Sequence, residues 1–116
     1  MMANPKRGEL EIILAEKKFN GRITLDVVQR IEMGLDLGVV EIAQQLSQGK
    51  LKMNEISFIL HPIIKAGGND ISEKEVAELC WKNGLSNTLS IIAQIVTSIL
   101  DPSGEEGNEK EAAQSV

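Results

Sequence analysis

The spacing of apolar residues changes character near residue 24, from a period of two to a helical period. Residues 9–14 alternate polar and apolar side chains, which is typical of a strand with one buried face. Leu10, Ile12 and Leu14 share that face. The pattern therefore predicts that the chain begins with a short β-strand.

A second strand is expected at residues 18–24, after a turn at residues 15–17, with Phe19 and Ile23 on one face. The Asn20–Gly21 pair offers an alternative turn, because Asn-Gly is the strongest short hairpin signal. We favour the earlier turn, since the later one would use the start of the next helix as strand.

The stretch from Thr24 to Lys52 indicates two short amphipathic helices. Thr24 is a good N-cap, because its hydroxyl can accept a hydrogen bond from a first-turn amide, and Asp26 suits the positive end of the helix dipole. Four residues form the apolar stripe of the first helix. They are Val27, Val28, Ile31 and Leu35.

Gly34 and Gly38 bracket the end of this first helix, since a residue without a Cβ readily takes the left-handed conformation that ends a helix. The second helix is predicted at residues 39–48 and ends at Gly49. Its apolar face comprises Val39, Ile42, Ala43 and Leu46. Each helix is too short to be stable alone, so both must pack on other elements.

A third helix is expected to begin at Asn54 as its cap and to end at Gly67–Gly68. Its apolar residues follow helical spacing closely. They are Ile56, Ile59, Leu60, Ile63 and Ile64. Pro62 lies inside the segment and clashes with the carbonyl of Phe58, four residues earlier, so the sequence predicts a kink or a break.

Two further helices complete the chain. Ser72 and Glu75 form a capping box at the start of the fourth helix, which ends near Gly84. Its inward residues are Val76, Leu79 and Cys80. The fifth helix is predicted at residues 86–100, with the widest apolar face, and is expected to be the most enclosed. That face comprises Leu89, Ile92, Ile95, Val96, Ile99 and Leu100.

These patterns predict an α+β fold, mainly α, in which a short N-terminal β-hairpin precedes about five short helices. Residues 1–7 are expected to be a flexible lead-in, residues 8–100 a single domain, and residues 101–116 a disordered acidic tail. Hydrophobic residues make up 42% of the 116 residues but aromatic residues only 3%. The core must therefore be aliphatic.

The formal net charge of −5 is concentrated in the tail. Residues 101–116 hold five acidic residues and one lysine, so the rest of the chain has a net charge near −1. None of the predicted helices carries the stripe of Lys and Arg that a duplex-binding surface needs. Nucleic acid is therefore not an expected partner.

Cys80 is the only cysteine, which excludes an intrachain disulfide and a zinc site made of several thiolates. The N-terminus lacks an apolar core of the signal-peptide type, and no apolar run approaches the length of a membrane span. We expect no membrane association, and a cytoplasmic location. A free cysteine on an inward helix face usually behaves as a small hydrophobic residue.

No residue pattern indicates catalysis, a cofactor or a metal. His61 is the only histidine and has no ligand or base at a suitable spacing, so it is interpreted as an ordinary helix residue. The segment from Gly67 to Asp70 lacks the lysine of a phosphate-binding loop and is interpreted as a helix end. Glu9 and Glu11 point outward from a strand and form a solvated face. The sequence predicts a protein that is not an enzyme.

Partner binding is the chemistry that the sequence favours instead. Phe58 and Trp81 both fall outside the main apolar stripes of their helices. Together with Met33 and Met53 they are candidates for an exposed recognition patch of the kind that partner helices use. The alternative is that a second layer of the domain covers them. The sequence leaves open whether the chain also associates with copies of itself.

The order of glycines and apolar residues resembles that of the small gene transfer agent family of phage-like tail proteins. The resemblance covers about residues 5 to 100. Its features are Gly8-Glu9 opening a hairpin, Thr24 before a helix with Ile31-Glu32, the joint from Gly34 to Gly38, Leu46, Gly49 and Leu51, Gly67-Gly68, Glu75-Val76, and Gly84-Leu85 before a last apolar helix.

This resemblance implies a tail assembly chaperone that transiently binds the tape measure protein while tail tube subunits polymerise. It would act in the bacterial cytoplasm during assembly and be absent from the mature particle. A structural role as a minor tail or tail tube component is the alternative. An alternative from a different class of function is a small cytoplasmic regulator or interaction module.

Overall fold

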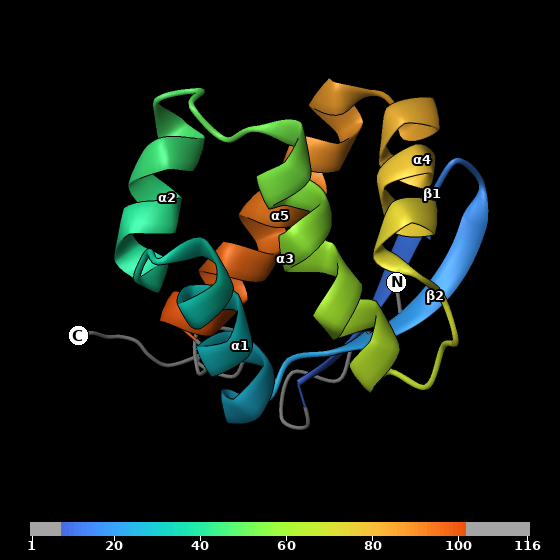
Figure 1. Cartoon of the computed structure of the whole chain (residues 1–116), viewed down its shortest axis with the longest axis horizontal. Coiled ribbons are helices and arrows are strands. Elements are labelled where there is room, and N and C mark those ends of the chain that lie inside the picture. Colours follow the sequence, from blue (N-terminus) through green and yellow to red (C-terminus); the bar gives the residue numbers. More distant parts are fainter. Residues whose placement is uncertain (1–7, 102–116) are drawn as a thin grey trace, which may run out of the picture.

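The computed structural model describes residues 8–101, which form a β-hairpin followed by five helices (Figure 1). The elements are β1 (Glu9–Leu14), β2 (Lys17–Arg22), α1 (Leu25–Leu35), α2 (Val39–Ser47), α3 (Met53–Ala66), α4 (Glu73–Asn83) and α5 (Leu85–Leu100). The predicted fold class is confirmed. The predicted lead-in and all of the predicted tail after residue 101 lie outside the described residues.

The hairpin turns at Ala15 and Glu16, so the earlier of the two turns is confirmed. Both residues have positive φ, 50° and 72°, as the tight two-residue hairpin turn requires. The Asn20–Gly21 pair lies inside β2 instead. A Cβ on Gly21 would come within 2.9 Å of the side chains of Ile12 and Ile63, so this glycine is needed for close packing rather than for a turn.

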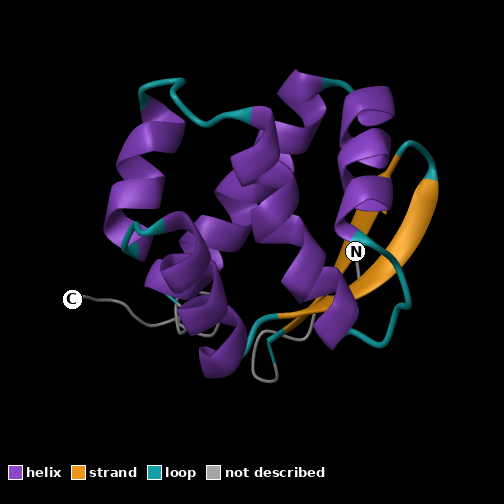
Figure 2. Ribbon diagram, in the orientation of Figure 1, coloured by secondary structure: helices purple, strands orange, loops and turns teal. Residues whose placement is uncertain are grey.

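The buried core is centred on α3, which contacts α1, α4, α5 and β2. Figure 2 shows helices surrounding α3 and the hairpin lying along one side. Seven residues of α3 are buried, compared with four of α5. The expectation that the fifth helix is the most enclosed was therefore wrong. The central helix is short of charge and has apolar residues on most of its circumference.

Helix α3 runs without interruption from Met53 to Ala66 and includes Pro62. The predicted break does not occur, and Pro62 is buried in the helix that packs against α1, α4, α5 and β2. Asn54 is not the cap. The N-cap position is Lys52, whose amide donates to the Glu55 carboxylate at 2.8 Å.

At the joint between α1 and α2, the residue in the left-handed conformation is not the one that the sequence predicted. Asp36, with φ 56°, ends α1, whereas Gly34 is helical and Gly38 is the extended N-cap of α2. Gly34 is needed for space: an added Cβ would lie 2.0 Å from Cζ of Phe58. The absence of a side chain at this position lets the Phe58 ring pack directly on the α1 backbone.

Glutamate side chains complete the N-terminus of α2, where Gly38 has no side chain to cap the helix. The Glu32 carboxylate accepts a hydrogen bond from the Val39 amide at 3.0 Å, and Glu41 accepts one from the Gly38 amide at 2.8 Å. Two carboxylates thus satisfy two free amides at the positive end of the helix dipole.

The remaining predicted caps are confirmed. The Thr24 hydroxyl accepts from the Val27 amide at 3.1 Å. In α4, Ser72 Oγ accepts from the Glu75 amide at 3.1 Å, and the Glu75 carboxylate accepts from the Ser72 amide at 2.9 Å. The hydrogen bonds from the Ser72 backbone and side chain lower the pKa of Glu75 below its usual value of 4.5.

The contact between Gly34 and Phe58 predicts that Gly34→Ala destabilises the protein by roughly 1–3 kcal/mol, because the new methyl group overpacks the contact with the ring. Helix propensity alone predicts the opposite sign, a gain of up to about 1 kcal/mol. Urea unfolding followed by circular dichroism measures the difference. Gly38→Ser is the matched control, since a Cβ there meets only the Glu41 and Glu32 carboxylates, at the ordinary contact distances of 3.7 and 3.8 Å. A Gly34→Ala protein as stable as wild type would contradict the contact.

The Ser72–Glu75 box predicts a pH-dependent contribution to stability. Because the pKa of Glu75 is lower in the folded than in the unfolded state, the ionised side chain stabilises the fold above pH 4.5, and this contribution is lost as the pH falls through the lowered value. The Tm difference between wild type and Glu75→Gln should therefore shrink at acidic pH. Glu73→Gln, in the same helical turn, is the control, and an equal pH trend in both variants would refute the assignment.

Candidate interaction surface

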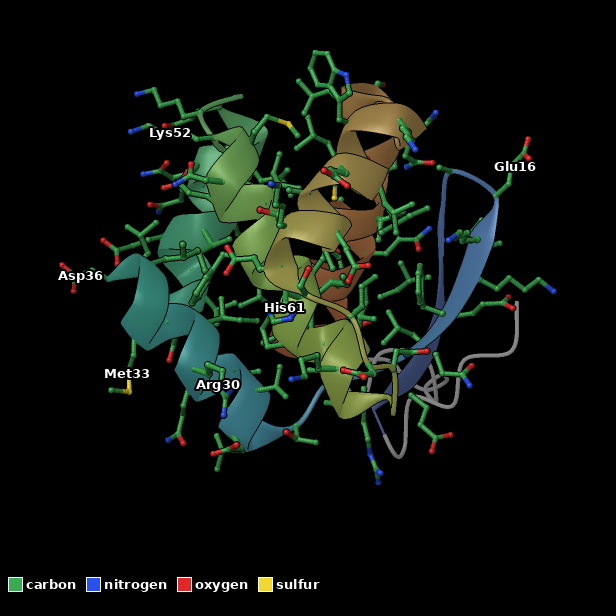
Figure 3. The ribbon with its side chains drawn as sticks, turned by 45° about the vertical axis from the view of Figure 1, so that its right-hand side comes forward. Glu16, Arg30, Met33, Asp36, Lys52 and His61 are labelled. Atoms are coloured by element: carbon green, nitrogen blue, oxygen red, sulfur yellow. The ribbon has the colours of Figure 1, made fainter. Side chains whose placement is uncertain are left out.

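Two of the four residues predicted to bind a partner are strongly exposed. Met33 is 83% exposed on α1 and Trp81 is 76% exposed near the end of α4. Figure 3 shows the Met33 side chain pointing away from the body of the molecule. Both side chains are large and apolar, and each lies on a helix whose opposite face is buried. Packing of the helices therefore fixes the backbone at these two positions, while the side chains lie in solvent, where a partner can reach them.

The other two candidates are half-buried and take part in packing. Phe58 lies against Gly34 of α1, and Met53, the first residue of α3, packs against the core. Both of the possibilities that the sequence left open therefore occur. The domain covers Phe58 and Met53 in part and leaves Met33 and Trp81 in solvent.

The four residues come from α3 and from the two helices α1 and α4 that pack against it. Helices α1 and α4 both contact α3 and lie on different sides of it (Figures 1 and 3). Phe58 touches Gly34, the chain neighbour of Met33, whereas Trp81 belongs to the helix on the other side. The two exposed candidates, Met33 and Trp81, thus lie at separate positions on the surface.

Five further large apolar side chains are exposed that the sequence did not single out. They are Ile13, Leu25, Val40, Leu85 and Leu100. Leu100 was expected to face inward, which was wrong: it is the last residue of α5 and is 50% exposed, because no element within residues 8–101 covers it. Position at the first or last turn of a helix is the signal that would have identified most of this set.

Asn83 fixes the end of α4 close to Trp81. Its side-chain oxygen accepts a hydrogen bond from the Ala15 amide at 3.0 Å, and its amide group donates to the Thr88 hydroxyl at 3.1 Å. Thr88 is fully buried. One side chain therefore joins the hairpin turn, α4 and α5, and nothing in the sequence pattern indicated this role.

His61 has a structural role, as interpreted from the sequence. Its Nε2 atom lies 2.9 Å from the carbonyl oxygen of Ile71, which precedes α4. The ring is half-buried on α3 and points toward the connection between α3 and α4 in Figure 3. The histidine therefore links this connection to the central helix.

Cys80 is fully buried and faces inward, as predicted. Burial raises the pKa of its thiol from 9.0 to about 11, because the charged thiolate loses its hydration. The thiolate is the nucleophilic form of cysteine, so Cys80 is unreactive at neutral pH. Its place in the core, one residue before Trp81, instead holds the last turns of α4 against the domain.

The segment from Gly67 to Asp70 ends α3, as interpreted from the sequence. Gly67 follows the helix, and a Cβ there would lie 1.9 Å from the carbonyl oxygen of Asn20. The Asn69 amide group donates to that same oxygen at 2.7 Å and to the Ile64 carbonyl at 2.9 Å. The loop therefore ties the end of α3 to the hairpin.

A shallow depression of about 240 Å³ lies between the hairpin and the end of α3. Its charged lining residues are Glu9, Glu11 and Arg22. The two glutamates line this open depression and not the core, which agrees with the outward direction predicted for them. Glu11 also lies 3.7 Å from Lys18, an exposed ion pair of little energetic weight. The lining contains no paired nucleophile and base.

Within residues 8–101, no three His, Cys, Asp or Glu side chains are grouped so that they could hold a metal ion. In the same range, every helix is too short or too polar to cross a membrane.

Comparison with family models shows that residues 7–101 match the family described as phage tail tube protein, GTA-gp10. The chain belongs to this family. The match covers the hairpin and all five helices, and it confirms the resemblance to gene transfer agent and phage tail proteins. Searches of curated proteins and of solved structures gave no match. The GTA-gp10 family assignment therefore places the protein among phage tail-related proteins.

The burial of Cys80 predicts very slow reaction of the folded GTA-gp10 family protein with a thiol reagent. At pH 8 a thiol with a pKa of about 11 is almost entirely protonated, and the core also excludes the reagent. The rate of modification by iodoacetamide, measured by mass spectrometry, should rise by orders of magnitude in denaturant. Equal rates in buffer and in denaturant would show that Cys80 is accessible.

Proposed function

We propose that this protein is a non-enzymatic tail assembly chaperone, which binds the tape measure protein transiently while the tail tube forms around it. The proposal combines the family assignment with the exposed apolar side chains of Met33 and Trp81. Tail tube subunits are a second partner. The exposure of Trp81 on a rigid helix is the observation that carries the proposal most directly.

A chaperone of this kind must cover apolar helix faces of its partner and then release them. Trp and Met side chains suit this task, because Trp contributes a large contact area and Met adapts to irregular surfaces. Two separate exposed positions on α1 and α4 give a small contact area, and small contact areas are typical of transient complexes. The charged residues Arg30 and Lys82 are exposed beside them on the same helices.

The absence of catalysis is part of the same proposal. The side chains most often used in catalysis, His61 and Cys80, have packing roles in the structure. We further propose that the protein acts in the bacterial cytoplasm during assembly and does not remain in the mature particle.

The proposal predicts that Trp81→Ala weakens binding to the tape measure protein by about tenfold or more, because removal of an exposed aromatic anchor typically costs over 1.4 kcal/mol of binding free energy. Met33→Ala should weaken binding less. Titration of the purified proteins by calorimetry measures both effects. Lys82→Ala and Gln29→Ala, at exposed positions of the same helices, are the controls.

Co-expression with the tape measure protein is the experiment that can refute the proposal. The tape measure protein should become more soluble when the wild-type chain is present, and a complex should be recovered by affinity purification. If neither occurs, the protein is not a chaperone for this partner. If the Trp81→Ala variant binds as tightly as wild type, the contact does not lie at this position of α4.

A structural component of the tail tube is the second candidate, because the family description itself names a tail tube protein. Quantitative mass spectrometry of purified particles separates the two functions. Stoichiometric amounts of the chain in mature tails would favour the structural role, whereas its absence from tails would favour the chaperone.

A further inference from the structure

The start of α3 and the end of α4 lie at one end of the domain. The two helices pack together and run in opposite directions in Figure 1. Their relative level follows from the bond between His61 of α3 and the carbonyl oxygen of Ile71, just before α4. Met53 is eight residues before that bond along α3, and Trp81 is ten residues after it along α4, roughly 12 and 15 Å away. Met53 and Trp81 therefore lie at nearly the same level.

The turn of the β-hairpin belongs to the same end. The Ala15 amide donates to the Asn83 side chain at 3.0 Å, so the turn is fixed beside the last residue of α4. Figure 3 shows Glu16 of the turn and Lys52, at the start of α3, both at the upper end of the molecule. The hairpin turn, the start of α3 and the end of α4 therefore form one continuous surface.

Two strongly exposed apolar side chains lie at this surface. Trp81 is 76% exposed, and Leu85, which opens α5 directly after α4, is 51% exposed. The Gly84 amide donates to the Trp81 carbonyl at 3.3 Å, so the chain between them turns tightly. The half-buried Met53 lies at the same level. We call the surface formed by these three apolar residues and the hairpin turn the Trp81 end.

Positive charge gathers at the Trp81 end, although the chain as a whole is acidic. Five of the nine Lys and Arg residues within 8–101 lie there, all exposed, against three glutamates, whereas the rest of this range holds four basic and ten acidic residues. Lys18 is paired with Glu11 at 3.7 Å, and the other four lysines make no ion pair within the described residues. The five lysines are Lys17, Lys18, Lys50, Lys52 and Lys82, and the three glutamates are Glu16, Glu55 and Glu78.

We propose that the Trp81 end docks an acidic amphipathic helix, with its apolar side chains on Trp81 and Leu85 and its carboxylates near the surrounding lysines. Charge complementarity identifies this occupant. Cations surround the apolar centre, and the net negative charge of the rest of the domain repels an acidic segment, so the electrostatic field guides it to this end. The inference rests on the proposed function and adds to it the chemistry of the tape measure segment that is bound.

Two other acidic occupants fit the surface less well. A nucleic acid is disfavoured because the cations are all lysines, without the planar arginine group that binds phosphate in pairs of hydrogen bonds, and because the centre is apolar. The acidic tail of the chain itself follows Asp101, at the far end of α5 and roughly 24 Å from Leu85. Its first two glutamates, at positions 105 and 106, are too few residues beyond Asp101 to span that distance.

Two synthetic helical peptides test the surface on the full-length chain. One has Leu on one face and Glu on the other, and the second has Lys in place of each Glu. The Glu peptide should bind at least tenfold more tightly than the Lys peptide, shift the emission of Trp81 to shorter wavelength, and lose affinity steeply as salt is added. Failure of the Glu peptide to bind, equal affinity for both peptides, or binding without a change in Trp81 emission would overturn the inference.

Charge reversal locates the contact. The double variant Lys17→Glu and Lys52→Glu changes the hairpin and the α3 parts of the surface together, because a single exposed lysine contributes little. It should bind the Glu peptide at least tenfold more weakly and gain affinity for the Lys peptide. Arg30→Glu with Lys65→Glu, exposed and away from this end, changes the net charge equally and should bind as wild type does. Circular dichroism confirms that both variants are folded, and equal losses in both would show that net charge alone acts.

The tape measure protein separates this inference from the proposed function. If it binds wild type and the Lys17→Glu, Lys52→Glu variant equally well, the chaperone function stands and the inference fails. If the Glu peptide binds as expected but the tape measure protein does not, the surface stands and the proposed function fails. A peptide of residues 102–116 or a single-stranded oligonucleotide that binds more tightly than the Glu peptide would also overturn the inference, because the occupant would then be the tail or a nucleic acid.

Discussion

Burial of the α3 helix is the constraint on which the rest of this small domain depends. The chain has three aromatic residues, so its core must be built from aliphatic side chains, and four fully buried ones on α3 supply its centre. They are Ile56, Leu60, Ile63 and Ile64. The hairpin and the helices α1, α4 and α5 each bury one side against this helix. The hairpin and the 11-residue helices α1 and α4 are too short to be stable alone, so their conformations depend on α3.

The positions of the exposed side chains follow from this arrangement. Because α1 and α4 each use one side to cover α3, their other sides must face solvent, and Met33 and Trp81 lie there. Small specific contacts then fix these helices in place. The closest are the Phe58 ring against Gly34, and Asn83 between the hairpin turn and α5.

Local patterns in the sequence predicted much of this framework. The alternation at residues 9–14, the Thr24 cap and the Ser72–Glu75 box depend on neighbours along the chain, and each was read correctly. Errors arose where a contact distant in sequence decided the outcome. Gly34, which was predicted to help end the helix, is instead required by its contact with Phe58.

The interaction surface was predictable only in part, for the same reason. Helical spacing showed that Trp81 and Phe58 lie outside the apolar stripes, but it could not show that α1 covers Phe58 and that no element covers Trp81. It also could not show that Leu100 lies beyond the reach of the core. Exposure depends on how elements pack, and a periodic pattern specifies only which side of an element is apolar.

The fluorescence of Trp81 tests the central claim most directly, because it is the only tryptophan of the chain and is 76% exposed. The free protein should show the long-wavelength emission of a tryptophan in water. A tape measure segment without tryptophan, added in excess, should shift the emission to shorter wavelength as the indole becomes buried. A complex that forms without any change in this emission would contradict the claim that Trp81 is a principal contact.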